Sequence, residues 1–302
     1  MKNKIAIASA FIAASSFSFA EIALTEAFSV KGFVNTLYSD SSGNDAANDA
    51  EFDLAEVEIS FLFNTGAVSA QVDIDYQNDN DGDLDQAFIN FDVFGGTITA
   101  GLFDSQLGFE GFEAPDLYTN TLNYGLDGQG AADSGVKYTR QLDAVSSLGV
   151  ALIDAGSFIG DEDADDTTIE IAYGRDLGNG FNAFVGYRSD ENGDAFVNAY
   201  VTYDTGAMKY AVEVNEDEDG DNSYQLFANY AYADNASLTV RYTTAENGGD
   251  INNGLAPDDD LEILTLAHQL ALADNLMLTT EINDNGQNEE EHEFSVSLLF
   301  TF

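Results

Sequence analysis

The sequence predicts an all-β fold, a transmembrane antiparallel β-barrel of about sixteen strands. Apolar and polar residues alternate with a period of two in segments along the whole chain, as strands with one apolar and one polar face require. Tight turns and longer acidic loops alternate between these segments. The alternation also continues to the last residue, Phe302, at a position where a soluble domain is usually frayed and polar.

The first 20 residues have the parts of a secretory signal peptide in their usual order. Lys2 and Lys4 form a basic start, Ile5–Ala14 is mostly apolar, and small residues precede the expected cleavage site. The alternative is an N-terminal membrane anchor, but the apolar run is shorter than the roughly 20 residues that span a bilayer. We therefore expect a signal peptide over 1–20 and one barrel domain over 21–302.

The composition restricts the partners of the expected barrel. The chain has a formal net charge of −46 and no cysteine, so backbone pairing and burial must hold the fold without disulfides. Such an acidic chain is a poor partner for nucleic acid and for anionic headgroups. The acidic residues crowd into short stretches, and the sequence between these stretches is apolar, which argues against disorder.

The strand pattern can be followed from the first segment to the last. Residues 27–40 form the expected first strand, and 67–77 alternate apolar with polar or acidic side chains. The pattern recurs in 167–174 and 236–243, and in 294–302 the aromatic and aliphatic residues share one face. Each segment is about ten residues long, the length with which a tilted strand crosses a membrane.

The connections sort into two classes that alternate along the chain. Tight turns begin near Thr65, Gly95, Leu142, Leu177, Thr205, Ala233 and Ala271. Longer, acidic loops begin near Ser39, Asn78, Asp104, Ala155, Asp190, Asn215, Glu246 and Asp284. One end of the sheet should therefore carry turns and the other loops. A soluble sandwich also alternates, but only a closed barrel leaves no unpaired edge in lipid, so we expect the last strand to pair with the first.

With its signal peptide, even strand count and terminal Phe302, the chain resembles the Gram-negative porins. The resemblance implies an outer-membrane location, short periplasmic turns and long extracellular loops. It also implies a homotrimer, recognition of the C-terminal strand by the barrel assembly machinery, and contact with outer-membrane lipid. The implied function is a water-filled channel for passive diffusion of small hydrophilic solutes.

The third long loop, between Asp104 and Asp133, is the least repetitive part of the sequence. Loops of this length are commonly functional, and in the porins the third external loop folds into the lumen and narrows it. By this resemblance, the loop would place the carboxylates of Glu110, Glu113 and Asp116 in the channel. Phe109, Phe112 and Tyr118 would pack on the wall, and Pro115 would stiffen the bend. The alternative is an exposed acidic loop, which would leave these aromatic residues in water.

If the apolar face of each strand points outward, a set of charged residues must face the lumen, because charge on the lipid face is costly. These residues are Lys31, Glu56, Glu58, Asp73, Asp75, Asp92, Lys137, Glu170, Arg188, Lys209, Glu213, Arg241, Glu262 and Glu281. Carboxylates outnumber cations among them, which favours passage of cations. The alternative is that these charges only solvate the interior and pair across strands. A few cations could instead oppose the loop carboxylates and set a transverse field in the constriction, namely Lys31, Lys137, Arg188, Lys209 and Arg241.

No cofactor and no dedicated metal site is expected. Residues 78–82 and 217–220 resemble the first half of an EF-hand loop, but Phe88 and Leu226 stand where the bidentate Glu is required. What remains is weak surface binding of Ca²⁺ or Mg²⁺ by the acidic loops.

Enzymatic function is not expected. The chain has only two histidines, His268 and His292, and neither lies in a recognisable catalytic motif. Two alternatives to a general diffusion channel stay open. One is a channel specific for a nutrient class, and the other is a non-conducting adhesin or structural barrel.

Overall fold

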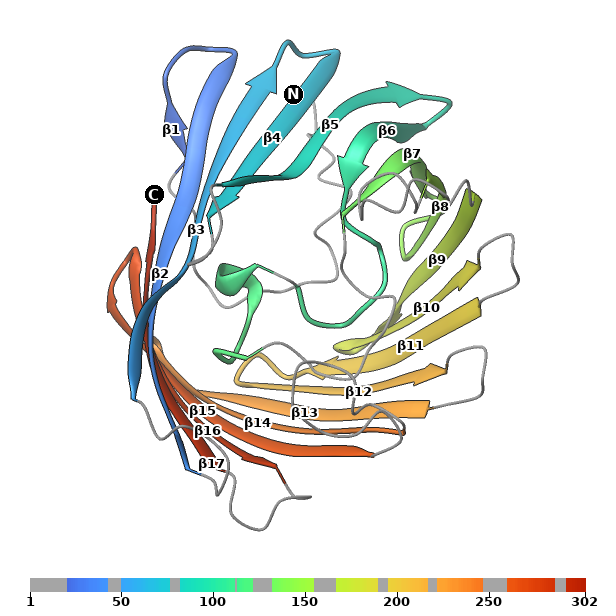
Figure 1. Ribbon diagram of the computed structural model, residues 1–302. Helices are drawn as coiled ribbons and strands as arrows, with labels where there is room; N and C mark the ends of the chain where they lie inside the picture. Colours follow the sequence, from blue (N-terminus) through green and yellow to red (C-terminus); the bar gives the residue numbers. More distant parts are fainter. Residues whose placement is uncertain are drawn as a thin grey trace.

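The computed structural model is a closed antiparallel barrel (Figure 1). It describes residues 21–42, 50–76, 82–111, 113–121, 132–154, 167–189, 195–216, 222–246, 260–285 and 292–302. The expected signal peptide, Phe112 and most of the two stretches that resemble EF-hand loops lie outside the described residues. Within them there is no α-helix, and η1 (Ala114–Asp116) is a single 3-10 turn.

Sixteen strands, β2 to β17, form the ring, and each pairs with the next in the chain. The first half comprises β2 (Phe28–Ser42), β3 (Glu51–Asn64), β4 (Val68–Tyr76), β5 (Asp83–Val93), β6 (Gly96–Phe103), β7 (Asp133–Gln141), β8 (Ser146–Asp154) and β9 (Thr167–Gly178). The second half comprises β10 (Phe181–Ser189), β11 (Ala195–Asp204), β12 (Met208–Glu216), β13 (Asn222–Ala233), β14 (Ala236–Ala245), β15 (Leu261–Ala273), β16 (Leu276–Asn285) and β17 (His292–Thr301). The predicted barrel and its strand number are confirmed.

The ring closes where β17 pairs with β2 in an antiparallel register from His292 opposite Ser42 to Thr301 opposite Phe33. Gly32 and Phe302 exchange two backbone hydrogen bonds, at 2.8 and 2.9 Å, beyond the last strand pair. The expected pairing of the last strand with the first is therefore confirmed. A two-residue strand that was not predicted, β1 (Ile22–Ala23), pairs with the turn end of β2, at Ser29 and Val30.

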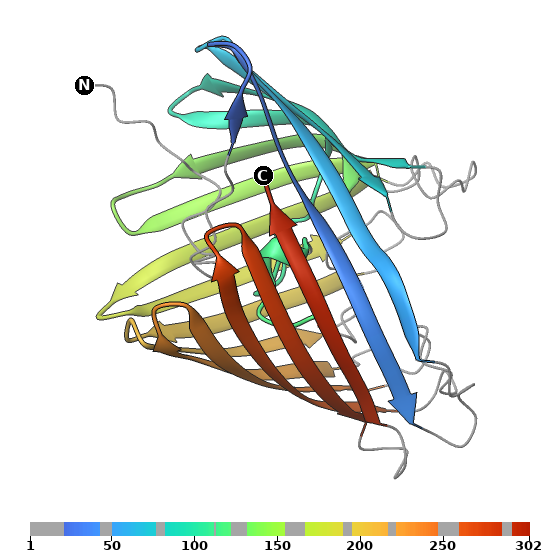
Figure 2. The ribbon, with the colours of Figure 1, turned by 90° about the vertical axis from the view of Figure 1, so that its left-hand side faces the viewer.

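The short connections all lie at one end of the barrel (Figure 2). Asn179 and Gly180 both have positive φ, 56° and 88°, so this two-residue turn has the twist that suits a hairpin. Phe94 and Gly95 repeat the arrangement, with φ of 52° and 78°. The predicted tight turns are therefore confirmed.

The two faces of the wall differ as the sequence predicts. Side chains such as Val68, Leu266 and Phe300 are exposed on the outer face, which is the apolar band that lipid requires. On the inner face, Ser60, Asn198 and many other polar residues are buried. Among the residues that the structure describes, no helix has the length and apolar character needed to cross a membrane.

Glu262 is a correction to the predicted inner face. It stands opposite Thr244, on the same side of β15 as the exposed residues Leu264 and Leu266, and it accepts a hydrogen bond from Tyr242 Oη. The inner side of β15 begins with the buried residues Leu261 and Ile263. Because apolar residues occupy both faces here, the charge of Glu262 did not indicate the correct side.

Candidate functional site: the lumen and its inward loop

The chain leaves the wall after β6 and turns into the barrel (Figure 1). The described part of this inward loop, residues 104–111 and 113–121, lies inside the ring and contacts the inner faces of strands on several sides. The third long loop was predicted to fold into the lumen, and its contacts with the inner faces of the strands agree with this prediction. Its attachments to the wall decide which parts of the lumen the loop occupies.

Polar side chains of β9 to β12 hold the beginning of the loop. Glu170 accepts hydrogen bonds from Ser105 Oγ at 2.6 Å and Gln106 N at 2.8 Å. Asn198 Oδ1 accepts from Gly108 N at 3.0 Å, and Glu213 Oε1 accepts from Phe109 N at 2.9 Å. These wall residues satisfy backbone donors that would otherwise be buried without a partner.

The end of the described loop is attached to β16 and β17. Glu281 accepts from Asn120 N at 2.5 Å and from Thr121 Oγ1 at 2.7 Å. Asn120 also bonds Ser295 and Ser297 through its side chain, at 2.9 and 2.6 Å. Glu170, Glu213 and Glu281 therefore act as attachment points of the loop.

Arg241 and Glu110 form a buried ion pair of 2.9 Å, with 1% and 3% of their side chains exposed. Arg241 also donates to Thr119 Oγ1, to the carbonyl of Thr121 and to Thr121 Oγ1. Glu110 was expected to present its carboxylate to the channel, and this is wrong, because the carboxylate points into the wall at Arg241. The pair draws two parts of the loop to one strand, β14.

Aromatic residues complete the packing of the loop on the wall. Phe109 and Tyr118 are buried against Phe227, with ring centroids 5.1 and 5.0 Å away in edge-on geometry. Tyr200 joins the same cluster, and Phe184 stacks on it at 4.7 Å. Pro115 is also buried, within η1.

Two glycines of the inner face leave room for the loop. A Cβ on Gly149 would collide with the side-chain amide of Gln106, and one on Gly186 would collide with Leu107 Cδ2. Leu107 is 2% exposed. These glycines in strand interiors were a signal of close approach that sequence reasoning did not use.

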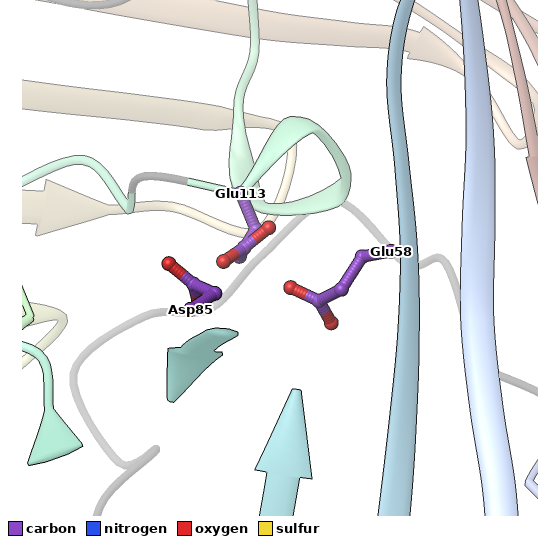
Figure 3. A group of neighbouring side chains, drawn as sticks. All are labelled: Glu58, Asp85 and Glu113. Carbon is purple, nitrogen blue, oxygen red and sulfur yellow. The ribbon is translucent and has the colours of Figure 1, made fainter. Parts of the chain in front are cut away.

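The tip of the loop approaches the opposite wall at a group of three carboxylates, Glu58 of β3, Asp85 of β5 and Glu113 at the start of η1 (Figure 3). One oxygen from each lies within 4.8 Å of the others. Burial, and next the charges of Glu58 and Glu56, raise the pKa of Glu113 to about 11. We call these three residues the carboxylate triad.

Asp85 was not among the predicted lining residues because of a β-bulge. The β4–β5 register shifts between Val72 and Ile74, opposite the two residues Asp85 and Gln86. Asp85 belongs to the triad, and Gln86 Oε1 accepts from Asp104 N at 3.4 Å, so both neighbours point inward. A strict period of two predicts only one of them on this face.

The basic side chains of the inner face are engaged by the wall and the loop. Arg188 pairs with Asp133 at 2.8 Å. Lys137 Nζ donates to the Asp104 carbonyl at 3.2 Å and lies 4.3 Å from the centre of the Phe103 ring. Lys209 Nζ donates to Tyr118 Oη at 3.0 Å.

The register assigns the remaining predicted lining residues. Lys31 stands opposite Ser60, Glu56 opposite Asn35 and Glu58 opposite Asp75, all on the inner side of β2, β3 and β4. Asp73 shares that side and is fully buried. Asp92 has the inner register position opposite Thr97, but it lies at the turn end and is exposed. Asp116 is half-buried in η1, where burial raises its pKa while Lys31 opposes the shift.

Both histidines lie on the outer side. His268 Nε2 is 2.7 Å from Tyr232 Oη, at the turn end of β15. His292 Nδ1 is 3.4 Å from Asp284 at the loop end of β17. Within the described residues, the inner face of the barrel therefore carries no imidazole.

No protein-family model matches the chain, and no curated protein sequence matches it. Among solved structures, it is similar to a variant of Rh. blastica porin, with 12% identity and a TM-score of 0.66 over 91% of this chain and 100% of that chain. It is also similar to OmpT, an outer membrane protein of Vibrio cholerae, with 16% identity and a TM-score of 0.57 over 94% and 100%.

The fold is that of the porin barrels. The expected resemblance to porins is confirmed at this level. A loop-deletion variant of OmpT matches as well, with 14% identity and a TM-score of 0.59 over 91% of this chain and 99% of that chain.

Proposed function

We propose that the protein is an outer-membrane channel that passes small hydrophilic solutes and ions by diffusion and favours cations. The observation that carries the proposal is the position of the carboxylate triad, because the tip of the inward loop meets the wall with acidic groups on both sides. Barrels of sixteen strands enclose an aqueous channel, whereas barrels of eight are filled by side chains.

The preference for cations follows from how the inner charges are used. The guanidinium groups of Arg241 and Arg188 are already paired with Glu110 and Asp133, so their fields are largely cancelled. The triad has three carboxyl groups and no ion pair with a described basic side chain. Ionised carboxylates at a constriction attract cations and repel anions; in the triad this charge must come from Glu58 and Asp85, because Glu113, with its pKa raised to about 11, is neutral near pH 7.

The same proposal includes the cellular setting. Export by residues 1–20, insertion into the outer membrane of a Gram-negative bacterium and assembly through the strand that ends at Phe302 are consistent with the exposed apolar outer face. A homotrimer is proposed by analogy with porins. A catalytic role is not proposed, because both histidines lie outside the lumen.

The test is single-channel recording of the folded protein in a planar bilayer under a KCl gradient. We expect stepwise conductance and a reversal potential on the cation side. Asp85→Asn should move that potential toward zero, because it removes a negative group from the constriction. Glu262→Gln, on the outer face, is the matched control and should leave the potential unchanged.

Three other outcomes are distinguishable. An anion-selective potential in the wild type would contradict the proposed bias. Saturable block by one nutrient class would favour a substrate-specific channel. Absence of conductance after repeated insertion of folded protein would contradict the channel itself and favour an adhesin or structural barrel.

A further inference from the structure

The carboxylate triad brings together three elements that are distant in sequence, β3, β5 and η1 (Figure 3). Its spacing can be compared with the needs of hard cations. Ca²⁺ lies about 2.3–2.6 Å from its oxygen ligands and Mg²⁺ about 2.0–2.1 Å from its own. Oxygens that all lie within 4.8 Å of one another are close enough for one ion to contact all three, and Ca²⁺ is usually held by protein oxygens whereas Mg²⁺ keeps several of its waters.

Buried oxygens without donors provide an independent observation. Asp85 Oδ2 and Glu113 Oε2 are covered, and no described residue donates a hydrogen bond to either atom. Buried polar atoms are nearly always satisfied, so each such group calls for an explanation, for which an ion is one of the usual candidates.

Asp73, which adjoins the triad in the strand register, supports the same conclusion. The residue is 0% exposed; Gln71 Nε2 donates to its Oδ2 at 2.7 Å, while its Oδ1 accepts no hydrogen bond from the described residues. On the inner face it stands next to the bulge that carries Asp85, and opposite Ser60, whose hydroxyl donates to Glu58 Oε1 at 2.8 Å. A fully buried carboxylate thus adjoins two members of the triad.

Among the described residues, acidic side chains outnumber basic ones around this group. Lys31 is the basic residue whose charge acts on Glu58 and Asp73, and Glu56, Asp75 and Asp85 add further negative charge to the same region. Carboxylates in such a cluster must share protons or bind a cation. Three carboxylates on separate elements, with a fourth beside them, are a typical ligand set for Ca²⁺.

We propose that Glu58, Asp85 and Glu113 bind one divalent cation, with Ca²⁺ preferred over Mg²⁺, and that this ion ties the tip of the inward loop to the wall. The site does not depend on conduction, because its ligands are placed by the fold. It differs from the surface binding expected of the acidic loops in being a single site inside the barrel.

Isothermal titration of CaCl2 into the folded barrel in detergent, in chelator-treated buffer with constant KCl, tests the proposal. The wild type should show one saturable site, beside any weak binding by the acidic loops. Glu113→Gln and Asp85→Asn should each weaken that site by more than the roughly 10–100-fold typical of an outer-shell ligand partner. Glu262→Gln removes a carboxylate from the outer face instead, and this control variant should keep the Ca²⁺ site at wild-type affinity.

Two further measurements keep the result interpretable. The heat-dependent shift in electrophoretic mobility shows whether each variant is folded, and a crystal soaked in MnCl2 should show anomalous density among the three carboxylates. Binding by the wild type that is only weak and unsaturable, or that Glu113→Gln and Asp85→Asn leave unchanged, would overturn the site. Channel recordings in EDTA separate this failure from that of the proposed function, because an open channel without the site still conducts.

Discussion

Arg241 shows how much a single inner-face residue determines. Its guanidinium pairs with Glu110 and bonds Thr119 and Thr121, with 1% of the side chain exposed. Removing one partner of a buried ion pair costs about 3–5 kcal/mol, because the remaining charge stays buried without compensation. Removing both partners together is often close to neutral.

Arg241→Met should therefore destabilise the barrel by about 3–5 kcal/mol, and Glu110→Gln in the same chain should restore part of the loss. The measurement is the denaturant concentration at the midpoint of unfolding, with electrophoretic mobility as the readout of the folded fraction. Arg188→Met is the control, because its pair with Asp133 is more exposed, at 17% and 5%, and its removal should cost less. Equal losses in the single and double variants would contradict a pairwise role.

Local patterns account for what the sequence predicted at this scale. Glu170, Glu213 and Glu281 were assigned to the inner face by alternation alone, which depends only on neighbours in the chain. That these carboxylates hold loop amides could not be predicted, because each contact joins residues more than 60 positions apart. Which loop carboxylate pairs with Arg241, and that the pair is buried, could not be predicted for the same reason, since Glu110 and Arg241 are 131 positions apart.

At the scale of elements, the inward loop and the wall fit because the strands beneath it lack side chains at particular points. Gly186→Ala would place a methyl group against Leu107 Cδ2, and overpacking of this kind costs about 1–3 kcal/mol. We expect the heat-dependent shift in electrophoretic mobility to occur at a lower temperature in Gly186→Ala than in the wild type. The loop should also be held less firmly, which should increase the noise of the single-channel current. Ala183→Val, on the outer side of the same strand, is the control and should change neither. A Gly186→Ala barrel with wild-type stability would show that the loop base is not packed as described.

The strands could be predicted as elements, but two details of their pairing could not. The bulge at Asp85 and Gln86 follows from the match between β4 and β5, and a single strand carries no signal of it. The side of β15 on which Glu262 lies was predicted wrongly because this strand has apolar residues on both sides. By contrast, the tight turns were predictable, since a pair such as Asn179–Gly180 favours the positive φ angles of a two-residue hairpin turn.

The whole molecule combines an apolar exterior with an acidic lumen, and Asp104 links the charge of that lumen to pH. It follows β6 and begins the inward loop, where Lys137 of β7 donates to its carbonyl. Burial, and next the charge of Asp85, raise the pKa of Asp104 to about 7, with Asp73 and Glu58 adding to the shift and Lys137 opposing it. Below this pH the carboxyl group is neutral, and above it the lumen gains negative charge.

Cation selectivity of the channel should therefore increase between about pH 6 and about pH 8, because Asp104 ionises in this interval. The measurement is the reversal potential under a fixed KCl gradient at several pH values. Asp104→Asn should reduce the increase across this interval, because the mutant lacks the carboxyl group that ionises near pH 7. Asp92→Asn, at the exposed turn end of β5, is the matched control and should keep it. If the reversal potential of Asp104→Asn rises with pH as much as that of the wild type, then another group in the lumen ionises in this interval, and the charge of Asp104 does not affect selectivity.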